Sequence, residues 1–239
     1  MPDIVFFTIS GANSKELVDR QYNHLLGSIE HHAQLGRHIV LDNSPRAFRR
    51  IFTKLPKSVT WIYEPIYGHG DENFRQTDAL NRIAFAAYQM KPDAVIYTDC
   101  DEFWTPNLVD VVEREAKDSL VHLPTIHVDV NGDHYFFPHE YHRRIWEGKR
   151  EVIFPYNKAK PSDLDNDTFQ GNPQRHSIAC ASEGMKTKTV HDICHHHMKC
   201  FMIGGGSWHL GKKLEKNPEW PAPLKEWKYS GVEPLYRFL

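Results

Sequence analysis

Apolar and polar positions along the first half of the chain predict strands that alternate with helices. Short runs of consecutive apolar residues are typical of strands buried on both faces, and they occur at residues 3–10 (DIVFFTIS), 37–44 (RHIVLDNS), 59–65 (VTWIYEP) and 93–99 (DAVIYTD). Between them lie amphipathic segments, which predict helices at residues 14–35, 45–55 and 72–90. This alternation predicts an α/β fold with a Rossmann-like, mainly parallel central sheet flanked by helices.

The second half of the chain is less regular. SLVHLPTIHVDV (residues 119–130) and REVIFPY (residues 150–156) predict a fifth and a sixth strand, joined to later elements by polar connections. We find no internal repeat or low-complexity block. We therefore expect a single domain over residues 1–239 that ends in an irregular second half.

The composition permits a large hydrophobic core. The small net charge does not indicate a particular class of binding partner. Of the 239 residues 40% are hydrophobic, and 29 lysines and arginines against 31 acidic residues leave a net charge of −2, so we expect no nucleic acid partner. Four irregularly placed cysteines favour reduced thiols. The first residues lack a secretory pattern, and no apolar run approaches the roughly 20 residues of a transmembrane segment. We expect a cytoplasmic protein whose function resides in local sites.

Polar residues are predicted to gather at one edge of the sheet. In open α/β sheets the ligand binds beyond the carboxyl ends of the strands. Here these ends carry Thr8, Ser10, Asp42, Asn43, Glu64 and Asp99. This edge is therefore the first candidate for an active site.

The most acidic strand end lies in AVIYTDCDEFW (residues 94–104), where an apolar strand leads into Asp99, Asp101 and Glu102. Converging carboxylates repel each other unless a cation, hydrogen bonds or a proton neutralises them. Hard divalent ions such as Mg²⁺ and Mn²⁺ prefer oxygen ligands of this kind. A solvated loop is the alternative, but Phe103 and Trp104 favour burial of the segment that follows.

Two short motifs resemble a known family. YTDCDEFW is similar to the DxD motif, often extended to DxDEF, of nucleotide-sugar glycosyltransferases with the A-type (GT-A) fold, in particular family 2-like members. GGGSWHL (residues 204–210) is similar to the Gly-Trp-His motif that follows DxD in several such families. The resemblance implies a GT-A fold with a nucleotide-sugar-binding half (residues 1–104) and an acceptor-binding half (residues 105–239).

The same resemblance implies a metal-dependent transferase. It would move a hexosyl or pentosyl group from a UDP- or GDP-sugar to a hydroxyl acceptor, such as a growing glycan, with inversion. Asp101 would bind the metal directly, Asp99 would bind the metal or the donor ribose, and His209 would supply an imidazole nitrogen. Mn²⁺ accepts this mixed shell better than Mg²⁺.

Further residues are candidates for binding the donor. By the same resemblance, Thr8 and Asp42 would hold the nucleoside. Arg75 and Gln76 are predicted to start a long helix, where backbone N–H groups and the helix dipole favour a phosphate. Ordinary turn chemistry and helix capping are the alternatives for these positions.

An inverting transfer needs a carboxylate that takes the proton from the acceptor hydroxyl. The resemblance places this base between the DxD motif and the late histidine, nearer the latter. Glu183 fits this position best and Asp192 comes next, while Asp165 and Asp133 remain alternatives.

GMKTKTVHDICHHHMKC (residues 184–200) has the most unusual composition in the chain. Lys186 or Lys188 would offset pyrophosphate charge, unless both belong to a solvated face. Cys194, His197 and Cys200 are possible zinc ligands, although their spacing matches no zinc finger or ribbon, and a histidine-lined strand facing the cleft is the preferred interpretation.

Two other functions remain open. A zinc-stabilised binding module would be centred on the histidine run. A nucleotidyltransferase would need a glycine-rich, basic phosphate loop after the first strand, of which SGANSKEL (residues 10–17) is a poor version.

Overall fold

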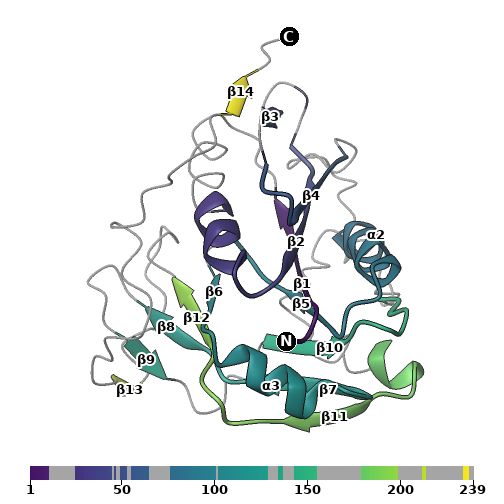
Figure 1. The fold of residues 1–239 in the computed structure, drawn as a ribbon, viewed down its shortest axis with the longest axis vertical. Helices are drawn as coiled ribbons and strands as arrows, with labels where there is room; N and C mark the ends of the chain where they lie inside the picture. Colours follow the sequence, from purple (N-terminus) through teal and green to yellow (C-terminus); the bar gives the residue numbers. More distant parts are fainter. Residues whose placement is uncertain are drawn as a thin grey trace, which may run out of the picture.

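The computed structural model describes residues 1–10, 25–44, 46, 49–52, 55–64, 76–100, 102–128, 134–136, 143–154, 179–198, 212–213 and 234–236. Its centre is a seven-stranded sheet in the order β11 (Lys186–Thr189), β7 (Ser119–Leu123), β10 (Arg143–Glu147), β5 (Ala94–Tyr97), β1 (Ile4–Ser10), β2 (Arg37–Asp42) and β4 (Val59–Tyr63) (Figure 1). Only β10 among these strands is antiparallel to its neighbours. The predicted mainly parallel α/β sheet is thereby confirmed.

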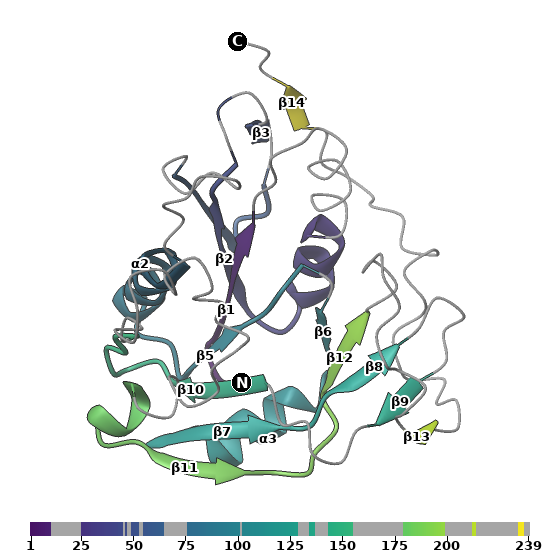
Figure 2. The same ribbon diagram turned by 180° about the vertical axis from the view of Figure 1, so that it is seen from behind.

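Two smaller sheets complete the described strands. One has the order β13 (Lys212–Lys213), β9 (His134–Phe136), β8 (Ile126–Val128), β12 (His195–Met198) and β6 (Glu102–Trp104), and the other pairs β14 (Pro234–Tyr236) with β3 (Arg50–Phe52). Figures 1 and 2 show β6 and β12 beside the central sheet. Because β5 leads into β6 through a short turn, the acidic segment lies where the two larger sheets meet.

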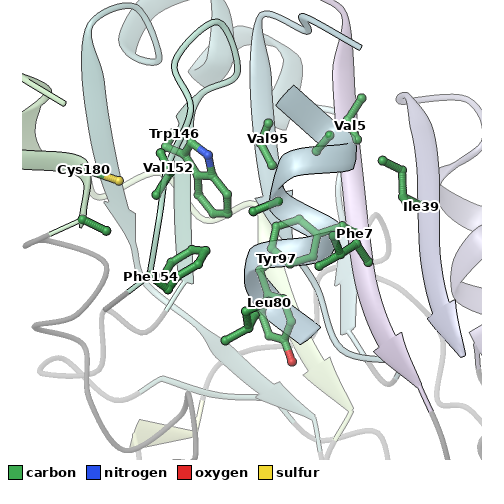
Figure 3. Packing of buried hydrophobic residues seen from close by; sticks show 14 of the residues in the cluster. Val5, Phe7, Ile39, Leu80, Val95, Tyr97, Trp146, Val152, Phe154 and Cys180 are labelled. Carbon is green, nitrogen blue, oxygen red and sulfur yellow. The ribbon is translucent and has the colours of Figure 1, made fainter. Parts of the chain in front are cut away.

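Helices cover both faces of the central sheet because its strands alternate apolar side chains between the faces. Val5 and Phe7 of β1 share a core cluster with Leu80 of α2 (Gln76–Gln89), and Figure 3 shows this packing. Ile4 and Phe6 belong to another cluster with α3 (Leu108–Glu115), and the helical residues 25–32 pack against Val40. Within the described ranges no helix is long and apolar enough to cross a bilayer.

Gly36 is required where the chain enters β2 beside β1. A Cβ atom at Gly36 would lie 2.3 Å from the main-chain oxygen of Ile4, and strand backbone cannot move aside cheaply. We expect Gly36→Ala to lower the free energy of unfolding by about 1–3 kcal/mol, as overpacking does. Urea titration measures this change, and an unchanged midpoint would contradict the close approach.

The helix predicted over residues 45–55 is wrong. Residues 50–52 form β3, which pairs antiparallel with β14 near the end of the chain. The partner strand lies far away in the sequence, so a local amphipathic pattern does not reveal this pairing.

The strands of the second half also differ from their predictions. Residues 119–130 contain two strands, β7 and β8, which belong to different sheets and are separated by Pro124 and Thr125. Proline lacks the N–H group that would continue a ladder. Residues 150–154 of the strand predicted at 150–156 are not in a strand, because the ladder is formed by β10 at Arg143–Glu147, and residues 155–156 lie outside the described ranges.

Candidate functional site

The described carboxylates of the acidic turn between β5 and β6 differ in burial. The main-chain N–H of Glu102 donates to the Asp99 carbonyl oxygen at 3.2 Å and closes the turn. Glu102 Oε2 accepts the main-chain N–H of Asp99 at 2.9 Å, and the Tyr97 hydroxyl donates to Asp99 Oδ1 at 2.6 Å. Asp99 is half-buried and Glu102 is fully buried. The turn therefore presents Asp99, whereas Asp101 lies outside the described residues.

The histidine run contributes a buried ring beside this turn. β12 pairs antiparallel with β6, which places His195 opposite Trp104. His195 Nε2 lies 3.5 Å from Glu102 Oε2, and His195 Nδ1 lies 3.2 Å from Thr125 Oγ1. His195 and His196 are fully buried. The prediction of a histidine-lined strand facing the cleft is therefore wrong for these two residues.

Thr8 ties β1 to the acidic turn. Its hydroxyl donates to the Thr98 carbonyl oxygen at 2.7 Å, and a carbonyl can only accept. Thr8 Oγ1 must therefore accept from His38 Nε2, 2.8 Å away. The side chain is fully buried and its only proton is already donated. Thr8 thus has no further proton to donate to a nucleoside, and its role in binding one remains a prediction.

A second polar group lies at the ends of β1, β2 and β4, with Ser10 and Tyr63 on either side of Asp42 in the strand register. Within the described part of the chain, Ser10 Oγ, the Tyr63 hydroxyl and both amide atoms of Asn43 are buried without a hydrogen-bond partner. Such groups destabilise a fold unless water or a ligand satisfies them. The sequence placed Ser10 and Asn43 at this edge but gave them no role, and Tyr63 was missed although it lies within a predicted strand.

Asp42 shapes this second group. Its Oδ1 accepts the main-chain N–H of Ser44 at 3.0 Å, which forms the turn that holds Asn43. Burial, and then the charge of Asp42, raises the pKa of Tyr63, and the guanidinium of Arg49 lies 4.0 Å from the centre of the Tyr63 ring. Because β5, β1 and β2 are neighbours, the structure brings Asp42 and Asp99 to the same edge.

The other predicted phosphate contacts are placed differently. α2 begins at Gln76 and leads back into β5, so its first turn lies towards the carboxyl edge of the sheet. Arg75 and the Gln76 side chain lie outside the described residues. Lys188 belongs to β11, from which β7 and β10 separate β5, and its Nζ pairs with Glu115 Oε2 at 3.3 Å. The structure therefore does not bring Lys188 to Asp99.

The structure corrects the leading candidate for the base. Glu183 precedes β11, whose first residue bonds to Asp118 just before β7, so Glu183 lies at the amino edge opposite Asp99. Asp192 Oδ2 forms an ion pair with Arg114 Nη2 at 2.8 Å. The alternatives Asp133 and Asp165 lie beyond the described ranges.

Of the three predicted metal ligands, the structure describes Asp99. Asp99 offers an oxygen ligand that suits a hard divalent ion, but the predicted ligands Asp101 and His209 lie outside the described residues. Among the residues that the structure describes, no group of three or more His, Cys, Asp or Glu is placed to hold a metal. Mn²⁺ or Mg²⁺ therefore remains a prediction.

Cys194 does not favour the zinc module. The thiol is fully buried in the apolar cluster around α3. Burial, and then the charge of Asp192, raises its pKa, so the thiolate that zinc requires is disfavoured. The second cysteine of the proposed site, Cys200, lies outside the described residues.

Comparison with known proteins gives distant structural similarity. No protein-family model matches the chain, and no curated protein matches it in sequence. A structure of S. aureus TarS 1-349 has a TM-score of 0.44 at 8% identity and covers 82% of this chain and 60% of that chain. Another TarS structure has a TM-score of 0.45 at 9% identity and covers 82% and 36%, respectively.

A third structure, TarS 1-349 in complex with UDP-GlcNAc, has a TM-score of 0.43 at 9% identity and covers 87% of this chain and 60% of that chain. The chain thus spans between 36% and 60% of the length of these structures. Similarity at this level does not assign the chain to a family.

Proposed function

We propose that the chain is a divalent-cation-dependent glycosyltransferase, which moves a sugar from a UDP- or GDP-sugar to a hydroxyl acceptor such as a growing glycan. One observation carries the proposal. At the carboxyl edge of the neighbouring strands β5, β1, β2 and β4, the half-buried Asp99 lies at one end, and the polar groups of Ser10, Asn43 and Tyr63, which have no hydrogen-bond partner among the described residues, lie at the other. The resemblance of YTDCDEFW to the DxDEF motif supports the same function.

The nucleoside would bind at the ends of β1, β2 and β4. The Asn43 amide offers a donor and an acceptor side by side, which complements the hydrogen-bonding edge of a nucleobase. From β5 to β4 there are three strand spacings, about 14 Å, which is room for an extended nucleoside diphosphate. Asp42, whose turn holds Asn43, would orient the base.

Asp99, with Asp101 and His209 as the expected further ligands, would hold Mn²⁺ or Mg²⁺ beside the diphosphate. A divalent cation there stabilises negative charge on a diphosphate leaving group. The hydrogen bond from the Tyr97 hydroxyl fixes the orientation of the Asp99 carboxylate. For inverting transfer of a hexosyl or pentosyl group to the acceptor hydroxyl, a carboxylate other than Glu183 would act as the base.

Asn43→Ala is expected to weaken binding of UDP or GDP about tenfold, because the base loses a pair of hydrogen bonds. The thermal midpoint of the unliganded protein should change little, since the lost amide has no partner there and this offsets the small cavity. Calorimetric titration and thermal unfolding measure the two effects. Equal nucleotide affinity in both proteins would contradict the nucleoside site.

The proposed function is tested by thermal-shift screening of nucleotide sugars with and without Mn²⁺, followed by assays of donor hydrolysis. A ligand at one hundred times its Kd stabilises the fold by about 2.7 kcal/mol, which shifts the midpoint measurably. We expect a shift with UDP- or GDP-sugars and cation-dependent release of the diphosphate. The proposal fails if none of these donors shifts the midpoint or is hydrolysed.

A further inference from the structure

We propose that Glu102 is the positioning residue of the acidic turn: it holds Asp99 in place for a divalent cation, and His195 in turn holds Glu102. This inference rests on the proposed function, since it assigns Asp99 to a bound cation. The sequence alone assigns no role to Glu102. It indicates that the histidine run forms a strand that lines the cleft or is a source of zinc ligands.

Glu102 Oε2 lies close to polar groups on both sides of the turn. It accepts the main-chain N–H of Asp99 at 2.9 Å and lies 3.5 Å from both Thr98 Oγ1 and His195 Nε2. Thr98 Oγ1 also accepts the indole N–H of Trp104 at 3.2 Å. One carboxylate oxygen therefore links the end of β5 to the turn and lies close to β12.

The burial of the two carboxylates separates their roles. Glu102 is fully buried and its Oε2 already accepts the main-chain N–H of Asp99, whereas Asp99 is half-buried. The bond that Glu102 accepts from the Asp99 main-chain N–H fixes the backbone that carries Asp99. Tyr97 then fixes the Asp99 carboxylate itself. Backbone and side chain of Asp99 are thus held by separate groups.

The second sheet keeps Glu102 in place. β12 lies between β6 and β8, so His195 stands between Glu102 on one side and Thr125, just before β8, on the other. The ring also packs against Trp104, with centroids 4.7 Å apart. From the helical residues 25–32, the hydroxyl of Ser28 donates to the Glu102 carbonyl oxygen at 3.2 Å. These contacts leave Glu102 little room to turn away from Asp99.

Glu102→Gln tests the inference, because it keeps the shape of the side chain and replaces one of the two carboxylate oxygens with an amide group that cannot accept a hydrogen bond. With UDP present, electron paramagnetic resonance of unbound Mn²⁺ gives the cation affinity independently of turnover. We expect about tenfold weaker Mn²⁺ binding, with a thermal midpoint in chelator close to that of the unaltered protein. Glu147→Gln is the matched control, since Glu147 is also a largely buried carboxylate but pairs with Arg150 away from the turn. It should bind Mn²⁺ unchanged.

His195→Phe separates positioning from a general loss of packing. His195 Nε2 lies 3.5 Å from Glu102 Oε2, so we expect its effect on Asp99 to pass through Glu102. The single variant should weaken Mn²⁺ binding less than Glu102→Gln, and the double variant should be no weaker than Glu102→Gln alone. Additive effects, or Mn²⁺ affinity within twofold of the unaltered protein for Glu102→Gln, overturn the inference.

A measurement on the unaltered protein covers the case in which a variant does not fold. The Asp99 amide lies outside any strand ladder, yet its bond to Glu102 should protect it from hydrogen exchange. Unprotected exchange overturns the inference, as does absence of Mn²⁺ binding to the unaltered protein. Mn²⁺ binding that depends on Glu102 without any sugar transfer would instead refute the proposed function and leave this inference standing.

Discussion

Lowering the pH from 7.5 to 5 is expected to reduce the free energy of unfolding by about 2 kcal/mol through His38 alone. Burial lowers the pKa of His38 to about 3. Burial, with the nearby rings of His31 and His38, also lowers the pKa of His32 well below 6.5. Total stabilities of 5–15 kcal/mol are common, so the loss is a large fraction. Urea titrations at a series of pH values measure it.

The direction follows from which state binds more protons. An unfolded histidine titrates near 6.5, so below this pH the unfolded chain takes up protons that the folded chain refuses. The contribution is therefore fully present above 6.5 and is lost progressively as the pH falls towards 3. Because carboxylates with ordinary pKa values are still mostly ionised at pH 5, the window from 7.5 to 5 reports mainly on the histidines.

The hydrogen bonds explain why these rings resist protonation. His38 already donates from Nε2 to Thr8, and its Nδ1 is buried without a partner, so a second proton would have no acceptor. His32 Nε2 accepts the main-chain N–H of Trp104 at 3.2 Å, and protonation there would break that bond. The His32 ring also stacks on Phe6 and on His38, and the His38 ring is tilted against Phe6.

His38→Gln is the control, because glutamine offers an N–H to Thr8 but does not titrate. Between pH 6 and 4 it should reduce the slope of stability against pH by about 1.4 kcal/mol per unit, the contribution of one proton. A stability that stays level from pH 7.5 to 5, or a slope unaffected by this substitution, would contradict the assignment.

Those parts of the fold that depend on local pattern were predictable from the sequence. β1, β2 and β5 are buried on both faces, so each appears as a continuous apolar run, and α2 shows its apolar face at helical spacing. β3 and β10 were missed because their ladders depend on partners far away in the chain or on the register of neighbouring strands. Local pattern carries no information about such partners.

The residues of the candidate site also divide into those that local sequence pattern predicts and those that depend on distant partners. Asp42 and Asp99 were found because they follow apolar strands directly, and the edge they share follows from parallel topology. Glu102 and His195 received no correct role, since their burial depends on β12 pairing with β6 across some ninety residues of sequence. Glu183 was misplaced because nearness to a late motif in sequence does not say at which edge of the sheet a residue lies.

Asp99→Asn is expected to reduce cation-dependent turnover at least about 100-fold, equivalent to about 2.7 kcal/mol of transition-state stabilisation. The amide keeps an oxygen for the Tyr97 hydroxyl but lacks the charge that holds a cation beside a diphosphate. The main-chain N–H of Asp99 keeps its bond to Glu102, so the fold should be retained. Initial rates of donor hydrolysis across a Mn²⁺ titration measure the effect, and thermal unfolding in chelator verifies the fold.

Asp118→Asn is the matched control at the opposite edge of the sheet. Asp118 has a φ of 54°, a conformation that asparagine also tolerates, and its carboxylate pairs with Arg150 at the surface. Exposed pairs of this kind contribute little to stability, so neither the fold nor turnover should change appreciably. If Asp99→Asn retains the turnover and the Mn²⁺ dependence of the control, a cation at this turn is not part of the reaction. If Asp118→Asn loses turnover to the same extent as Asp99→Asn, the loss does not depend on the position of Asp99 beside the ends of β1 and β2.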